Sequence, residues 1–303
     1  MKITLGAMPG PDGLPGLLSA VQAAADLGFA RLWLPQLPPL AEFPNWDALT
    51  TLALAGARTP GIGLGTAVVV AQTQHPFVMA RQALTASAAT DGRLILGIGV
   101  SHEAVIADMF GLSYEAPAAF LREYLEVLLP AMAGEPVDHH GKRITAVGQL
   151  DLPGAEAPTV VISALGPRML ALAGELTDGT VTTWAGLKAV EGHIVPRITK
   201  AAAEAGRPAP QVIVGLPVSV TDDVEAACEQ IAASFSPGDF PAYRAIFDVE
   251  GVDSVADICV FGDENEVAAQ LRRFAGAGAT EFSAMPMGDP ATVTRTLDVL
   301  AAL

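Results

Sequence analysis

Short runs of continuously apolar residues alternate along the chain with longer stretches in which apolar residues recur at helical spacing. The runs lie at 3–5, 31–34, 62–70, 94–100, 159–163, 179–184, 211–220 and 281–285. Continuous apolar runs are typical of strands that are buried on both faces, and such strands form parallel sheets. The pattern therefore predicts a parallel sheet whose strands are separated by helices.

The stretches between the runs predict the helices. Leu14, Leu17, Leu18 and Val21 recur at the spacing of one helix face, and Gly28 is placed to end that helix. Further helices are predicted at 46–58, 77–90, 115–133, 167–176 and 187–205, from 223 onward, and around 267–274 and 293–300.

Eight strand–helix units with no evident linker predict an α/β fold, a closed (β/α)8 TIM barrel, as one domain over residues 1–303. The alternative is a doubly wound Rossmann fold, which needs Gly-x-Gly-x-x-Gly after its first strand. Gly6 lies near that point, but the glycine spacing there does not fit. Residues 134–157 are rich in polar and turn-forming residues and are expected to be an insertion into the barrel.

The chain is strongly acidic, with a formal net charge of −16 and no run of lysine or arginine. Such a surface repels phosphate backbones, so nucleic-acid binding is not expected, and an anionic ligand needs a local site of opposite polarity. No apolar stretch reaches the roughly 18–20 residues that span a bilayer. A strand pattern begins at Ile3, which leaves no room for a signal peptide. We therefore expect a cytoplasmic protein without a membrane segment.

No metal site is predicted. The two cysteines, Cys228 and Cys259, are far apart in the sequence and fit no zinc pattern. His139 and His140 are adjacent, so in an extended segment their side chains point in opposite directions, and no third ligand is nearby.

In a (β/α)8 barrel the active site is built from the loops that follow the strands. This rule selects candidates before any motif is considered. They are Gln36 after the second run, Thr66, Ala67 and Val68 in the third, Ser101, His102 and Glu103 after the fourth, Ala164 to Arg168 after the fifth, and Trp184 after the sixth.

The segment Ala164, Leu165, Gly166, Pro167 and Arg168 leads directly into a predicted helix. A helix amino terminus presents unpaired N–H groups and the positive end of the helix dipole, and Arg168 adds a cationic fork. The segment could therefore bind an anion such as a phosphate. The other interpretation is an ordinary helix start with a solvated arginine.

The segment Ser101, His102 and Glu103 also has two interpretations. Its backbone could bind a cofactor tail while Glu103 or His102 donates a proton. Otherwise Ser101 caps a helix and Glu103 is a favourable first-turn charge. Similarly, Gln36 could hydrogen-bond a cofactor ring or only its own loop.

The tryptophans are assigned by position. Trp33 and Trp46 are expected in the core. Trp184 ends a strand, where it could line a ring pocket or pack in the core.

Taken together, several segments resemble the luciferase-like monooxygenase superfamily, and within it the actinobacterial branch that uses the deazaflavin coenzyme F420. They are specific for the superfamily and less specific for that branch. The segments are 24–29 with 32–33, 63–68, 75–76 with 82–83, 93–99, 164–170, 173–175 and 178–179, and more weakly 262–264 with 267 and 270–271, and 276–280.

The resemblance implies where a cofactor would lie. The ring would lie over the third strand, against a bulge with a non-proline cis peptide at Ala67-Val68, and 164–168 would hold the phosphate. Ser101, His102 and Glu103 would lie near the tail or the ring. Several relatives carry Asp, often followed by His, where Gln36 stands, which argues against an acid or base there and removes the main cue for a sugar-phosphate dehydrogenase.

The resemblance implies an oxidoreductase that transfers a hydride between coenzyme F420 and a small organic substrate, with Glu103, His102 and Gln36 as candidate catalytic residues. Two alternatives stay open, an FMN-dependent luciferase-like monooxygenase and a non-catalytic barrel that binds the deazaflavin as a carrier or sensor. The resemblance also implies a homodimer, and the small apolar residues of 46–58 and 77–90 suit close packing on that side.

Overall fold

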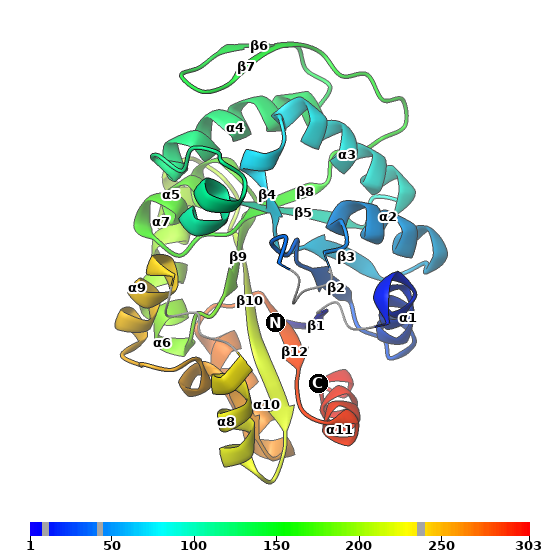
Figure 1. Cartoon of the computed structure of the whole chain (residues 1–303), viewed down its shortest axis with the longest axis vertical. Helices are drawn as coiled ribbons and strands as arrows, with labels where there is room; N and C mark the ends of the chain where they lie inside the picture. The colour runs from blue at the N-terminus through cyan, green and yellow to red at the C-terminus, as the bar shows by residue number, and fades with distance from the viewer. Residues whose placement is uncertain (8–11, 41–44, 235–239) are drawn as a thin grey trace. The chain divides into compact units, whose positions relative to one another are not determined.

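The computed structural model (Figure 1) describes residues 1–7, 12–40, 45–234 and 240–303. These residues form two compact units. The first unit holds Met1–Gly6, Asp26–Leu32 and Ala164–Leu303. The second unit holds Ala7–Ala25 and Trp33–Ser163. Each unit has parallel strands of its own.

The second unit is built on the strand β5 (Leu94–Gly99). β3 (Gly63–Thr66) and β8 (Thr159–Ile162) pair with β5 in parallel, and β4 (Val69–Val70) pairs with its later part. Every residue of β5 is buried, as expected for a strand that is covered on both faces.

The helices of the second unit follow the predicted apolar spacing. α1 ends before Gly28, whose left-handed φ of 82° is the conformation that glycine adopts past a helix end. α3 begins at Pro76, where the missing N–H costs nothing. The helical segments are α1 (Gly13–Asp26), α2 (Ala48–Arg58), η1 (Ala71–Thr73), α3 (Pro76–Ala89), η2 (Ala104–Met109) and α4 (Pro117–Met132).

A hairpin occupies part of the predicted insertion. β6 (Val137–His140) and β7 (Thr145–Gly148) pair in antiparallel fashion, and the hairpin lies beyond α4 at one end of this unit (Figure 1). Glu123 of α4 fixes the hairpin turn, because its carboxylate accepts hydrogen bonds from the N–H groups of Arg143 (3.0 Å) and Ile144 (3.3 Å). Desolvation raises the pKa of Glu123, but these backbone bonds outweigh it and hold the pKa below its usual value.

The first unit is built on β12 (Glu281–Pro286) and β10 (Gln211–Val220), which pair in parallel. β1 (Lys2–Gly6) pairs with β12, and β9 (Gly179–Thr183) pairs with β10. β11 (Val260–Gly262) pairs with the carboxyl end of β10. All of these pairs are parallel, as predicted.

The helices of the first unit pack on this sheet and on one another. α5 contacts α7, and the long strand β10 runs between α10 and α11 (Figure 1). The helical segments are α5 (Pro167–Leu176), α6 (Leu187–Ala189), η3 (Val190–Ile194), α7 (Val195–Glu204), α8 (Val224–Ser234), α9 (Pro241–Glu250), η5 (Val255–Ile258), α10 (Glu264–Gly276) and α11 (Pro290–Ala301).

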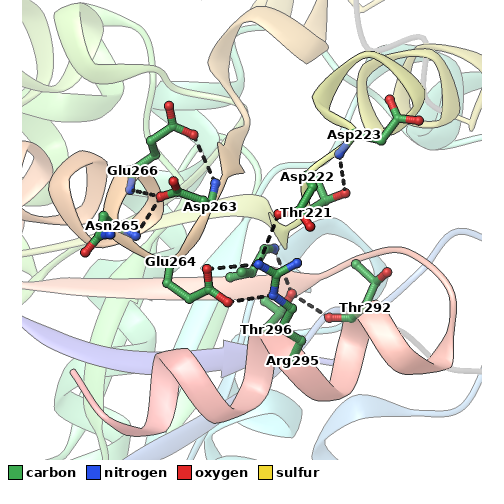
Figure 2. Close-up of polar contacts among 11 residues, drawn as sticks. Thr221, Asp222, Asp223, Asp263, Glu264, Asn265, Glu266, Thr292, Arg295 and Thr296 are labelled. Carbon is green, nitrogen blue, oxygen red and sulfur yellow. Dashed lines mark hydrogen bonds and ion pairs between the residues drawn. The ribbon is translucent and has the colours of Figure 1, made fainter.

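Ion pairs join the ends of these elements in the first unit (Figure 2). Arg295 of α11 pairs with Glu264 at the start of α10 (2.6 Å between Nε and Oε1) and with Asp222 just after β10 (3.1 Å). The hydrogen bond from Arg295 lowers the pKa of Glu264 to about 2. Asp263 caps α10 through its carboxylate. The cluster therefore fixes α11 to α10.

The strand predictions are confirmed, since every predicted run forms a strand, and 62–70 divides into β3 and β4. The sequence pattern missed α9, β11 and the hairpin. Trp33 lies in the core at 1% exposed, as predicted, but the same expectation was wrong for Trp46, which is 42% exposed. The reason is that α2 begins only at Ala48, after its cap Asp47, so Trp46 stands outside the helix.

Candidate active site

The loop after β2 (Arg31–Leu34) and the end of β3 hold each other in place. The Ala67-Val68 peptide bond is cis, as predicted, and it lies in the interruption between β3 and β4, which we call the bulge. Ala67 donates its N–H to the carbonyl of Leu34 (3.0 Å), and Gln36 donates its N–H to the carbonyl of Val68 (3.4 Å). The bulge is therefore part of a backbone network and not a loose loop.

Glycines of β5 make room for this bulge. Thr66 is fully buried, and its hydroxyl donates to the carbonyl of Gly97 (2.7 Å) and accepts from the N–H of Gly97 (2.9 Å). A Cβ added to Gly97 would collide with the carbonyl oxygen of Thr66, and one added to Gly99 would crowd Val68. The hydroxyl of Thr66 is thus used to hold the bulge.

The side-chain oxygen of Gln36 takes part in a hydrogen bond within the protein. Its Oε1 accepts a hydrogen bond from the N–H of Ala48, the first residue of α2 (2.9 Å). Only the amide nitrogen then remains to donate to a ligand. This contact is the local role considered for Gln36, and it argues against an acid or base function.

β5 leads into a turn that carries the candidate acids. Ser101 has a left-handed φ of 54°, a conformation that costs a non-glycine residue about 1–3 kcal/mol. His102 is half-buried, and desolvation lowers its pKa, so its ring is neutral at pH 7. Glu103 is exposed at the start of η2, which no side chain caps. The alternative in which Ser101 caps this helix is therefore not supported.

Two side chains hold this turn. Tyr114 donates its hydroxyl to the carbonyl of Ser101 (2.9 Å), and Gln72 donates its amide to the carbonyl of Val100 (2.9 Å). Burial, and then the charge of Glu103, raise the pKa of Tyr114, so the phenol remains a donor. Sequence reasoning missed Tyr114 because it lies 13 residues beyond its partner and belongs to no motif.

The start of α5, in the first unit, has the features of an anion site. Gly166, Pro167 and Arg168 are exposed, and no side chain caps the helix at Gly166. A Cβ added to Gly166 would meet nothing within 4 Å, so open space lies beside the helix start. Arg168 makes no ion pair with any residue that the structure describes. The first-turn N–H groups and Arg168 can therefore receive an anion.

The loop before α5 is also held by a side chain. Nε2 of His193, in η3, lies 2.7 Å from the carbonyl oxygen of Leu165 and therefore donates to it. Ala164 is buried beneath the loop. His193 was not a sequence candidate, because a histidine within a helix pattern gives no sign of a partner 28 residues earlier.

Trp184 follows β9 in the first unit with a left-handed φ of 62° and is 8% exposed, so it packs largely in the interior. The helix after it is capped by Glu250 of α9. The Glu250 carboxylate accepts from the N–H groups of Lys188 (3.1 Å) and Ala189 (2.7 Å). Glu250 thereby fixes the segment that follows Trp184.

No group of three or more His, Cys, Asp or Glu that could bind a metal occurs among the described residues. His140 pairs instead with Asp138 (3.0 Å), and His139 lies 3.9 Å from Glu123. Within the described ranges, no helix is both long and apolar enough to cross a membrane.

Comparison with known proteins identifies the family. The model of the luciferase-like monooxygenase family matches residues 2–281. The chain belongs to this family. The predicted resemblance is thereby confirmed at the level of the superfamily.

The chain is similar in sequence to known enzymes, including a reductase and a dehydrogenase. The chain is 26% identical to the 5,10-methylenetetrahydromethanopterin reductase of Methanopyrus kandleri, over 89% of each chain. It is 31% identical to the F420-dependent glucose-6-phosphate dehydrogenase of Nocardia farcinica, over 60% of this chain and 57% of the relative.

A solved structure shows the fold. An F420-dependent secondary alcohol dehydrogenase in complex with an F420-acetone adduct superposes with a TM-score of 0.84, covering 99% of this chain and 97% of that chain at 18% identity. The fold is therefore the (β/α)8 TIM barrel of the luciferase-like family, as predicted.

Proposed function

We propose that the protein is an oxidoreductase that transfers a hydride between coenzyme F420 and a small organic substrate. Membership of the luciferase-like family supports an enzyme with a flavin-type cofactor. The observation that carries the choice of F420 is the sequence similarity to the F420-dependent dehydrogenase of Nocardia farcinica. The fold likeness to an F420-dependent alcohol dehydrogenase is consistent with it.

The start of α5 fits the anionic tail of such a cofactor. Gly166 leaves open space, and the N–H groups of Gly166, Arg168 and Met169 are the donors, since Pro167 has none. Arg168 adds a fixed positive charge. In a chain of net charge −16, this local polarity is what an anionic ligand needs.

The resemblance to the family supports roles for other residues toward the ring and the substrate. The backbone at Ala67-Val68 would support the ring, and Gln36 would donate to it through its amide nitrogen. When bound, the deazaflavin supplies the hydride chemistry, and the protein supplies position and electrostatics.

Glu103 is the proton acceptor that we propose for the direction in which an alcohol is oxidised, because its negative charge, which also raises the pKa of Tyr114, can take up a proton. Desolvation lowers the pKa of His102, so its neutral ring is the second candidate acceptor. Glu103 is exposed and stands at the end of a strand, where the catalytic groups of barrel enzymes lie.

Turnover tests this proposal against its alternatives. The protein is mixed with reduced F420 and a panel of ketones, aldehydes and activated alkenes, or with oxidised F420 and alcohols, and the absorbance of the deazaflavin is followed. Turnover with at least one substrate supports the proposal. Oxygen-dependent turnover with reduced FMN alone would support the monooxygenase, and tight F420 binding without turnover would support a carrier or sensor.

The proposal also covers the domain organisation, the oligomeric state and the location of the protein. We infer one catalytic domain over 1–303, a homodimer formed through the α2 and α3 side, and a cytoplasmic location. The small residues of these helices, such as Ala55 and Ala83, are buried within the chain, so the support for the dimer on this side is the exposed apolar side chain of Leu54.

A further inference from the structure

We propose that Tyr114 is a positioning residue, whose hydroxyl holds the turn Ser101–Glu103 in the conformation that presents Glu103 to the substrate. The role of Glu103 rests on the proposed function. The contacts of Tyr114 with the turn do not depend on it.

The turn needs to be held because its backbone is unfavourable for its sequence. Ser101 has a left-handed φ of 54°, which glycine adopts freely and serine does not. The two successive carbonyls at this point, of Val100 and Ser101, accept hydrogen bonds from Gln72 and Tyr114, each at 2.9 Å. Both contacts are between side chain and backbone, so they fix the direction of the chain just before Glu103.

The hydrogen bond from Gln72 to Val100 leaves the other end of the Gln72 amide unpaired, which indicates that this orientation of the side chain is specific. Oε1 of Gln72 is buried and has no hydrogen-bond partner among the described residues. A buried unpaired carbonyl oxygen is unfavourable. The amide nevertheless stays directed at Val100.

Tyr114 reaches the turn from a segment that is itself anchored. The N–H of Leu112 donates to the carbonyl of Ile106 in η2 (2.9 Å). On the other side, Glu115 pairs with Arg143 at the hairpin turn (3.3 Å). Tyr114 therefore connects a segment that is anchored on both sides to the carbonyl of Ser101.

The electrostatics suit a permanent donor. Burial and the neighbouring charge of Glu103 both raise the pKa of Tyr114, so the phenol keeps its proton over the working pH range. That proton is used on the carbonyl of Ser101, so Tyr114 acts on the reaction through the turn and not as the acid itself.

The test compares Tyr114→Phe with the matched control Tyr124→Phe. Each variant loses one hydroxyl, but that of Tyr124 is buried in α4 and makes no hydrogen bond with the described residues. Hydrogen exchange of the cofactor-free protein, read by mass spectrometry over 100–106, measures the turn directly. Steady-state kinetics then separate kcat from KM.

In Tyr114→Phe we expect faster exchange confined to the turn and a kcat lower by roughly 3- to 10-fold, the size of one hydrogen bond, with the substrate KM within about twofold. In Tyr124→Phe neither quantity should change. Unchanged exchange in Tyr114→Phe would overturn the inference. Faster exchange with unchanged kcat would also overturn it, since the role would then be structural only.

A second variant tests the mechanism. In a Ser101→Gly background, the left-handed turn no longer needs to be enforced, so adding Tyr114→Phe should lower kcat by less than about twofold. An undiminished loss in that background would contradict positioning through Ser101. Failure of the wild-type protein to turn over F420 would refute the proposed function, whereas the exchange data would still decide whether Tyr114 holds the turn.

Discussion

At the scale of single residues, glycine is required at one point of β5 for a steric reason. A Cβ at Gly97 would collide with the carbonyl oxygen of Thr66, whereas one at Gly276, at the end of α10, would meet nothing. We expect Gly97→Ala to destabilise the protein by about 1–3 kcal/mol or more, as for overpacked cores. Gly276→Ala should be neutral or stabilising by up to about 1 kcal/mol. Thermal melting of the two variants checks this, and equal melting temperatures would contradict it.

Arg168 is the residue on which the proposed phosphate site depends most. Loss of a charge-assisted hydrogen bond weakens binding by roughly 10- to 150-fold, so Arg168→Ala should raise the Kd for F420 by that order. Arg272→Ala, on the exposed face of α10, changes the net charge equally and is the control. Fluorescence titration measures both. An unchanged Kd for Arg168→Ala would show a solvated surface arginine, and a lower melting temperature of the cofactor-free variant would show a structural one.

At the scale of elements, the pair between α10 and α11 gives a pH prediction. The hydrogen bond from Arg295 lowers the pKa of Glu264 from 4.5 to about 2. A depressed acid pKa stabilises the folded state above the unfolded value, and this contribution is lost as the pH falls through the folded value. Glu264→Gln should therefore melt a few degrees lower at most at pH 7, because exposed pairs contribute little, and this difference should shrink as the pH falls toward 2.

Glu229→Gln, an exposed glutamate of α8, is the control for that experiment. It should not alter melting at either pH. A difference between wild type and Glu264→Gln that persists unchanged below pH 2 would contradict the assignment.

The elements that the sequence could predict are those with long apolar runs or clear helical spacing. β5 and β10 are examples, because burial on both faces leaves a continuous signal. β11 has only three residues, and each hairpin strand has four residues with a single buried position, too short for a periodicity. Helix ends were also hard to predict. The apolar spacing did not show that Asp47 caps α2, so Trp46 was placed inside the helix although it lies before it and is exposed.

Some residues of the candidate site could also be predicted from the sequence, and others could not. Residues next to strand ends, such as Glu103 and Arg168, could be selected because the barrel rule depends only on strand position. Tyr114, His193 and Glu250 could not, since each acts through one or two hydrogen bonds to the backbone of another segment. Pairing of that kind leaves no pattern in a single chain.

At the scale of the whole molecule, the proposed homodimer predicts a mass of twice 31.1 kDa by light scattering. Leu54 of α2 is 39% exposed, and Leu54→Glu should weaken a dimer formed on that side. Val249→Glu, at an exposed apolar position of α9, is the control and should leave the mass unchanged. A monomeric wild-type mass at micromolar concentration would contradict the proposal.

Binding of the deazaflavin in preference to FMN distinguishes the proposed oxidoreductase from an FMN-dependent monooxygenase. The most direct measurement is a fluorescence titration of the cofactor-free protein with F420 and, separately, with FMN under the same buffer and salt. We expect a lower Kd for F420 than for FMN. Equal or tighter binding of FMN would contradict it.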